Sequence, residues 1–233
     1  MTARLLEGTR LAVRIKANLQ EQVEQLKSKG VGLRLVSILV GANAGARIYA
    51  NQQKKACLEV GIDYELKVLV ESSTEQDVLK AIQQLNEDDS VTGIVLMMPV
   101  PAGMNARELQ SRIAPSKDVE AVHPANMGQL IYGRMELSPC TARAAVELLK
   151  YSGVELKGKE VVIVGHSEIV GKPLALMLLR SQTEAPTVTV CHIATGDLAL
   201  HTRRADTLLT AVGKPRWITA DMVKDGAVVI LSL

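Results

Sequence analysis

Apolar residues recur along the chain in two alternating patterns. In one they return every three or four positions, as on one face of a helix, and in the other they form short continuous runs, as in buried parallel strands. The helical pattern predicts helices over 11–26, 49–60, 73–85, 106–114, 141–153, 174–180 and 197–203. The apolar runs predict strands over 35–40, 64–70, 91–98, 160–164, 187–191, 207–212 and 227–231.

Strands that alternate with helices predict parallel sheets, and therefore an α/β fold with two three-layer domains. The length of 233 residues agrees with one or two domains. We place the boundary just before a helix that Thr141 can cap, which gives domains over 1–138 and 139–233. Ser73 and Gln76 have the spacing of a capping box, and the segment 115–133 is expected to be rich in loops.

Composition excludes several classes of protein. Apolar residues make up 47% and charged residues 22%, so neither a disordered chain nor a fibrous repeat fits. A net charge of +2, with four Tyr, one Trp and no Phe, argues against nucleic acid as a partner. With no apolar run of about 18 residues and no signal sequence, we expect a cytoplasmic protein without a membrane partner.

The three cysteines are widely scattered, which suits free thiols in a reducing compartment. Cys191 and His192 are the only Cys/His neighbours, and further ligands at short spacing are missing around them. We therefore expect no metal site.

Two loops with glycines follow strands in the second half of the chain. The segment 164–173 connects a strand to a helix, where backbone N–H groups and the helix dipole can hold a pyrophosphate. It lacks the G-x-G-x-x-G spacing, so the spacing favours a dinucleotide site only slightly over a plain tight turn. The segment 212–215 also follows a strand, so both loops are expected at the carboxyl edge of one sheet, where ligands bind.

Together with Pro139-Cys140-Thr141, these two loops resemble the bifunctional methylenetetrahydrofolate dehydrogenase/methenyltetrahydrofolate cyclohydrolase family. The first half agrees in order and spacing, with Tyr49, the turn 99–101, the run 117–119 and the pair 123–124. The resemblance covers essentially the whole chain. It implies an N-terminal folate-binding domain and a C-terminal Rossmann-type NAD(P)-binding domain with a parallel sheet.

The resemblance also implies a reaction and a set of partners. Members of the family oxidise 5,10-methylenetetrahydrofolate to 5,10-methenyltetrahydrofolate with NADP or NAD, and then hydrolyse the methenyl product. They are typically homodimers joined through the C-terminal domain. A tetrahydrofolate derivative is therefore the expected substrate.

Matching the family's motifs residue by residue gives a set of expected site residues. The catalytic positions are Tyr49, Gln53, Met97 and Glu120, and the substrate-binding positions are Tyr49, Pro99, Asp118 and Glu120. The cofactor-binding positions are Gly165, His166, Ser167, Ile169, Val170, Gly171, Pro173, Cys191, His192, Val212, Gly213 and Lys214.

Three of the matched positions depart from the family pattern in the folate domain. Gln53 occupies the position of a lysine that is essential to the family's hydrolytic step. A glutamine can donate a hydrogen bond but cannot act as a titratable acid or base. The glutamine that assists this lysine is Met97, and an aspartate that grips the pterin is Glu120. We therefore expect cyclohydrolase activity to be weak or lost. The alternative is a non-catalytic homologue that retains nucleotide or folate binding, or serves a partner.

Further departures lie in the second half. His166 occupies the position at which many members place an arginine against the 2′-phosphate of NADP, and Ile193 occupies the position of a serine that follows the Cys-His pair. We therefore expect a weak preference for NADP over NAD. The family's C-terminal Pro-x-Pro-Gly-Gly-Val-Gly-Pro segment has no counterpart before Leu233. A naturally short chain and a truncated longer one both remain open.

Several candidates also have a purely structural interpretation. Tyr49 can be a packed aromatic on a helix face, and Gln53 can be an ordinary polar helix residue. The simplest interpretation of Met97 is a side chain of the hydrophobic core. Asp118 can fold its own loop through backbone hydrogen bonds rather than touch substrate.

Overall fold

The computed structural model describes residues 3–214 and 216–232, so Pro215 of the second glycine loop and the terminal Leu233 lie outside the described residues. The described residues form two compact units. One spans Glu7–Pro124, and the other contains the residues from Ala125 onward together with those up to Leu6. The domain boundary expected between 138 and 139 stays a prediction.

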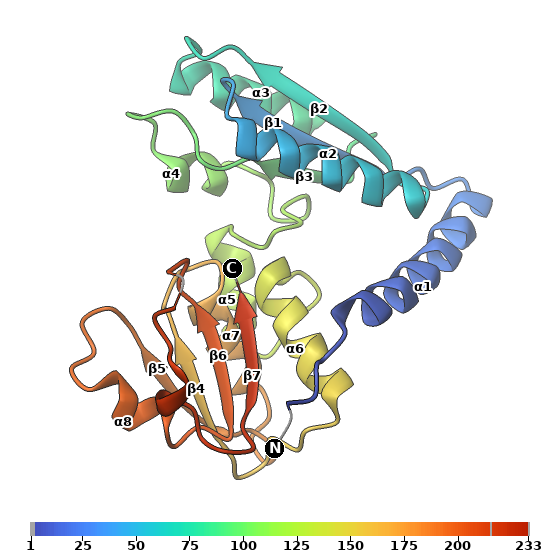
Figure 1. The fold of residues 1–233 in the computed structure, drawn as a ribbon. Coiled ribbons are helices and arrows are strands. Elements are labelled where there is room, and N and C mark those ends of the chain that lie inside the picture. The colour runs from blue at the N-terminus through green and yellow to red at the C-terminus, as the bar shows by residue number, and fades with distance from the viewer. Residues whose placement is uncertain (1–2, 215, 233) are drawn as a thin grey trace. The chain divides into compact units, whose positions relative to one another are not determined.

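The first unit contains a parallel three-stranded sheet with helices on both faces (Figure 1). The strand order is β2-β1-β3, with α2 on one face and α3 and α4 on the other. The elements are α1 (Gly8–Ser28), β1 (Arg34–Val40), α2 (Ala44–Glu59), β2 (Asp63–Leu69), α3 (Glu75–Glu87), β3 (Gly93–Leu96) and α4 (Ala106–Ser111).

The second unit contains a parallel four-stranded sheet in the order β5-β4-β6-β7. Residues of α5, α6 and α7 pack against one face, and α8 with the short η1 helix lies against the other (Figure 1). The elements are α5 (Pro124–Ile131), α6 (Cys140–Ser152), β4 (Glu160–Val164), α7 (Gly171–Leu178), β5 (Thr187–Cys191), α8 (Leu198–Thr202), β6 (Thr207–Ala211), η1 (Ala220–Met222) and β7 (Val228–Ser232).

Each sheet is covered on both faces, which explains why the inner strands β1 and β4 are nearly continuous apolar runs, whereas the edge strands β2 and β5 also contain polar residues. Successive residues of β1 alternate between the two faces, so Val36 and Ile38 pack on the α3 side while Leu39 packs on the α2 side. Burial of each such side chain stabilises the fold by roughly 1.5–3 kcal/mol. The predicted α/β class with parallel sheets is confirmed.

The strand orders also locate the edges where ligands bind. In the first sheet the chain moves from β1 to β2 on one side and later places β3 on the other side. In the second sheet β4 lies between β5 and β6 in the same way. Loops that leave the carboxyl ends of such a strand pair diverge in opposite directions and leave a crevice for a ligand.

Three local predictions are wrong. Residues 124–131 form the helix α5 instead of a loop, with Pro124 at a first helical position, where its missing N–H costs nothing. The capping box of α3 uses Thr74 and Asp77 rather than Ser73, because Thr74 has the extended backbone that a cap requires. Helix α6 begins at Cys140, so Thr141 lies inside it instead of capping it.

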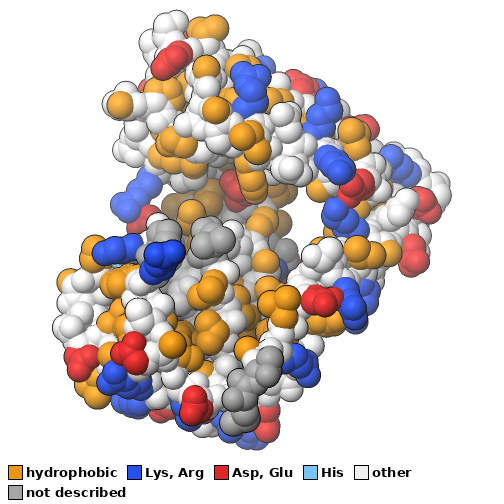
Figure 2. Space-filling model, in the orientation of Figure 1, with side chains coloured by type: hydrophobic (Ala, Val, Ile, Leu, Met, Phe, Trp, Pro, Cys, Tyr) orange, Lys and Arg blue, Asp and Glu red, His pale blue; other side chains and the backbone are white. Residues whose placement is uncertain are grey.

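Charged side chains of both signs are interspersed over the face drawn in Figure 2, in keeping with a net charge of +2. A face with mixed charges lacks the positive electrostatic potential that attracts polyanions to a protein. Within the described ranges, none of the helices combines the length and apolar character that crossing a bilayer requires.

Candidate functional site

Helix α2 places Tyr49 and Gln53 four residues apart, on one helix face. The helix begins after Asn43, whose side chain accepts a hydrogen bond of 2.8 Å from the backbone N–H of Ala46. The exposed fraction of Tyr49 is 53%, so the ring is not buried in the core. A half-exposed ring on a helix surface can stack on a flat ligand.

Gln53 is held by two hydroxyl groups that the sequence analysis did not single out. Its Oε1 accepts hydrogen bonds from Ser37 Oγ at 2.7 Å and from Tyr64 OH at 3.2 Å. Ser37 is fully buried in β1, and burial raises the pKa of the Tyr64 phenol in β2. Ser37 is a polar residue inside the apolar run 35–40, and a buried polar side chain needs a hydrogen-bond partner. This feature of the sequence could have indicated the contact.

Met97 lies in the core on the α2 side of the first sheet. It is 2% exposed and packs with Leu39, Ala46 and Ala50, as its interpretation as a core residue predicts. Its backbone N–H donates to Ile38 O at 2.9 Å and extends the pairing of β3 with β1. A thioether offers only a weak acceptor, so this position cannot orient a neighbour as an amide does.

Pro99 follows directly, exposed, in the turn after β3. The peptide bond between Met98 and Pro99 is cis. Pro99 lies just beyond the carboxyl end of β3, the edge at which ligands of parallel sheets bind.

Asp118 folds the loop that carries Glu120. Its fully buried carboxylate accepts hydrogen bonds from His123 N at 2.8 Å and from Val122 N at 3.3 Å. An isolated bridge also pairs Asp118 with Ile94, so the loop begins beside β3. This confirms the prediction that Asp118 can fold its own loop through backbone hydrogen bonds.

The Glu120 carboxyl is half-buried and titrates close to neutrality. Burial, and secondly the nearby Asp118 carboxylate, raise its pKa to about 7. Both effects disfavour the charged form. A carboxyl group in this state can exchange a proton with a ligand near neutral pH.

The next residue, Ala121, has a left-handed backbone with a φ of 52° and is completely buried. A side chain in this region costs about 1–2 kcal/mol, whereas glycine adopts it freely. Ala121→Gly is therefore expected to raise the free energy of unfolding by about 0.5–1 kcal/mol, after the larger entropy of glycine in the unfolded chain is subtracted. Urea denaturation measures the change, and a lower stability would show that contacts of the methyl group outweigh the strain.

In the second unit, two glycines fix the turn between β4 and α7. Gly165 has a φ of +118°, and a Cβ there would lie 2.4 Å from the Ala211 carbonyl oxygen at the end of β6. A Cβ on Gly171 would lie 2.0 Å from the Gly165 carbonyl oxygen. Both positions are therefore restricted to glycine by backbone contacts. The turn lies directly against the end of β6, which agrees with the prediction that the two glycine loops lie at the same edge of the sheet.

Between these glycines, the turn exposes residues that can contact a phosphate. His166, Ser167 and Ile169 are exposed, and Val170 is half-buried. Ser167 Oγ accepts a hydrogen bond of 3.2 Å from Val170 N, which holds the turn, and Pro173 is buried in the first turn of α7. An open turn ahead of a helix N-terminus is suited to an anion such as a pyrophosphate.

Two histidines come together at the same edge. The rings of His166 and His192 have centroids 4.8 Å apart and are tilted by 59°. The parallel register pairs Val164 with Cys191, so the residues that follow them emerge side by side. His192 Nδ1 also accepts a hydrogen bond of 3.1 Å from Ala194 N, and Cys191 is buried in the core. This contact was not predicted, although His192 directly follows one expected strand and His166 lies two residues beyond another.

The second glycine loop continues from β6 through Val212, Gly213 and Lys214. Val212 is half-buried, Gly213 and Lys214 are exposed, and Lys214 Nζ lies 5.6 Å from the centroid of the Trp217 ring. A cation over an indole face is a favourable contact. Over residues 3–214 and 216–232, the structure contains no group of three or more His, Cys, Asp or Glu side chains that could hold a metal ion.

The sequence matches two family models. Residues 6–120 match the catalytic domain of tetrahydrofolate dehydrogenase/cyclohydrolase, and residues 139–231 match its NAD(P)-binding domain. The chain is 47% identical over 228 residues to the bifunctional protein FolD 2 of Mesorhizobium japonicum, across 98% of this chain and 74% of that protein. It is 43% identical over 230 residues to the bifunctional protein FolD of Ruminiclostridium cellulolyticum, across 99% and 80%.

Solved structures of the same family are also similar to this chain. The bifunctional FolD enzyme of Campylobacter jejuni superimposes with a TM-score of 0.93 at 42% identity, over 97% of this chain and 79% of that one. A 5,10-methylenetetrahydrofolate dehydrogenase of the silkworm Bombyx mori gives 0.93 at 38% identity, over 99% and 82%. The FolD enzyme of Trypanosoma brucei, complexed with NADP and an inhibitor, gives 0.92 at 33% identity, over 98% and 78%.

Proposed function

Because the chain belongs to the tetrahydrofolate dehydrogenase/cyclohydrolase family, we propose that it oxidises 5,10-methylenetetrahydrofolate to 5,10-methenyltetrahydrofolate with NAD or NADP. The turn 165–171 would hold the nicotinamide cofactor, which would supply the acceptor for a hydride from the methylene carbon. The observation that carries the proposal is the turn 165–171: a Cβ on either of its two glycines would lie within 2.5 Å of a backbone oxygen, and its exposed residues precede a helix N-terminus.

The folate unit supplies the groups that would hold the substrate. The exposed Tyr49 ring offers a surface on which the pterin can stack, and Pro99 is exposed in the turn after β3. Glu120 offers a carboxyl group for the pterin's N–H groups, on a loop that Asp118 folds. Hydride transfer depends chiefly on the orientation of two bound rings, so the absence of the lysine affects the oxidation less directly than the hydrolysis.

We propose that hydrolysis of the methenyl product is weak in this chain. Gln53 occupies the position of the family's lysine and is bound to Ser37 and Tyr64. An amide can donate a hydrogen bond, but it supplies neither a titratable proton nor a positive charge to a developing anion. Met97 is a core residue and adds no polar group.

The reaction is tested by mixing purified protein with 5,10-methylenetetrahydrofolate and either NAD or NADP in separate cuvettes. The expected result is the appearance of reduced nicotinamide, followed by its absorbance, with at least one cofactor. Folded protein that gives no turnover with either would contradict the proposal. It would instead favour a non-catalytic homologue that retains nucleotide or folate binding.

His166 is expected to limit the preference for NADP over NAD. An arginine can bind a phosphate with two charged hydrogen bonds, each contributing roughly 1.5–3 kcal/mol. His166→Arg is therefore expected to raise the NADP/NAD ratio of kcat/KM by about tenfold or more. The control is His201→Arg, which adds the same group on α8. A strong NADP preference in the wild type would show that the histidine already recognises the 2′-phosphate.

We also propose that the chain forms a homodimer through its C-terminal unit. Strand β5 is an edge of the second sheet, and Val190 on it is 40% exposed while Ile193 just beyond is 82% exposed. Edge strands offer unpaired backbone groups to a second copy. Light scattering is expected to give twice the chain mass, and Val190→Lys is expected to shift the protein toward monomer. A monomeric wild type would contradict this proposal.

A further inference from the structure

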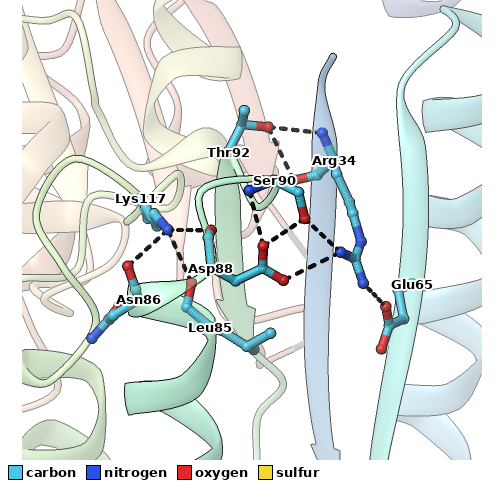
Figure 3. Close-up of polar contacts among 8 residues, drawn as sticks. All are labelled: Arg34, Glu65, Leu85, Asn86, Asp88, Ser90, Thr92 and Lys117. Carbon is cyan, nitrogen blue, oxygen red and sulfur yellow. Dashed lines mark hydrogen bonds and ion pairs between the residues drawn. The ribbon is translucent and has the colours of Figure 1, made fainter.

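The Lys117 side chain ends at the C-terminus of α3 (Figure 3). Its Nζ donates to the backbone oxygens of Leu85, Asn86 and Asp88 at 3.0, 2.8 and 2.7 Å. Carbonyl groups in this part of a helix lack helical partners and form the negative end of its dipole. An ammonium group has three N–H donors, so these contacts account for all of them and hold the side chain in place.

Lys117 also begins the loop that carries Glu120. The Lys117 carbonyl oxygen accepts from Ile94 N at 2.8 Å, which fixes the loop's start beside β3. Three residues later comes Glu120, and the Asp118 carboxylate draws the chain back by binding His123 N at 2.8 Å. The placement of the Glu120 carboxyl therefore depends on an anchor before it and an anchor after it.

We propose that Lys117 is a positioning residue for the folate site, which fixes the loop 117–123 against α3 so that Glu120 meets the substrate. This inference rests on the proposed function, because it assigns Glu120 to the pterin. A purely structural cap of α3 would affect the stability of the unit and leave substrate affinity unchanged. The two roles therefore differ in a measurable way.

Arg34 provides a matched control within the same network. Its guanidinium contacts Glu65, donates to Ser90 Oγ at 2.8 Å and pairs with Asp88 at 3.4 Å (Figure 3). These partners lie in β2 and in the segment after α3. Removing the Arg34 head group takes away comparable polar contacts at the same edge of the sheet, without removing the anchor of the loop.

The experiment compares Lys117→Met, Lys117→Arg and Arg34→Met with the wild type by steady-state kinetics and thermal melting. Lys117→Met is expected to raise the KM for 5,10-methylenetetrahydrofolate by about tenfold or more, with the KM for the nicotinamide cofactor changed less than about twofold. Lys117→Arg retains a cation and is expected to recover most of the loss. Arg34→Met is expected to lower the melting temperature and leave the folate KM unchanged.

A folded Lys117→Met variant with a wild-type folate KM would overturn the inference while the proposed function stands. If that variant does not fold, Lys117→Gln is the second test, with the same outcomes. A wild type without turnover contradicts the proposed function instead, and calorimetric titration with tetrahydrofolate then decides the inference. Equal binding by wild type and variant, or no binding by the wild type, would overturn it.

Discussion

Gln53→Lys is expected to raise the hydrolysis of 5,10-methenyltetrahydrofolate by about 100-fold or more, because a positioned acid or base contributes 10²–10⁴-fold in rate. The new ammonium would lie within reach of Ser37 Oγ and Tyr64 OH, which now donate to the Gln53 amide at 2.7 and 3.2 Å. Both hydroxyls can rotate to accept hydrogen bonds from lysine instead. The lysine would thus keep both hydroxyls as hydrogen-bond partners, as acceptors instead of donors.

The measurement follows the loss of methenyl absorbance under conditions in which the uncatalysed reaction is subtracted. Gln52→Lys is the matched control, since it places the same charge on the adjacent, exposed position of α2, about 100° around the helix. The control is expected to leave the rate unchanged. A folded Gln53→Lys protein with no gain would show that Met97 or another missing group also limits hydrolysis.

Glu120→Gln is expected to stabilise the protein at alkaline pH while weakening substrate binding. The pKa of Glu120 is about 7 in the folded protein, against an ordinary value of 4.5. As the pH rises between these values, the unfolded chain loses this proton while the folded protein retains it, so stability falls with pH. At pH 8 the neutral glutamine removes this penalty, and the free energy of unfolding is expected to rise by up to about 3 kcal/mol.

At pH 4 the same substitution is expected to change stability little, because Glu120 is then protonated in the folded protein and largely protonated in the unfolded chain. Urea denaturation at the two pH values measures the difference, with Glu24→Gln on α1 as the control for the change at an exposed position. The KM for 5,10-methylenetetrahydrofolate is expected to rise by about tenfold or more, since the amide cannot accept charge-assisted hydrogen bonds. An unchanged KM would remove Glu120 from the substrate-binding residues.

The sequence predicts strand bounds well where turn residues flank the strand on both sides. The bounds of the buried β4 and of the partly exposed edge strand β5 match the expected 160–164 and 187–191. Helix α5 was missed because Pro124 and Gly128 are typical of loops, and the burial of Leu130 against the second sheet is a tertiary effect. The local sequence contains no information about this contact of Leu130 with the sheet.

The candidate site was predicted less completely than the fold. The contact of Gln53 with Ser37 and Tyr64 depends on the register that pairs Ser37 with Leu66 and Leu35 with Tyr64 across β1 and β2. Motif spacing contains no information about such register. Likewise, the Lys117 cap joins residues about 30 positions apart through a helix end whose location is known only from the fold.

The turn 165–171 has a consequence for protein engineering. Its two glycines are fixed by the close approach of backbone atoms, and Ser167 holds the turn through Val170 N, whereas His166, Glu168 and Ile169 are exposed and their substitution need not disturb the packing of β4, β6 and α7. The turn therefore combines a fixed frame with a replaceable insert of these three residues. Libraries confined to the insert would be a direct means of selecting new cofactor specificities, including synthetic nicotinamide analogues, on an unchanged scaffold.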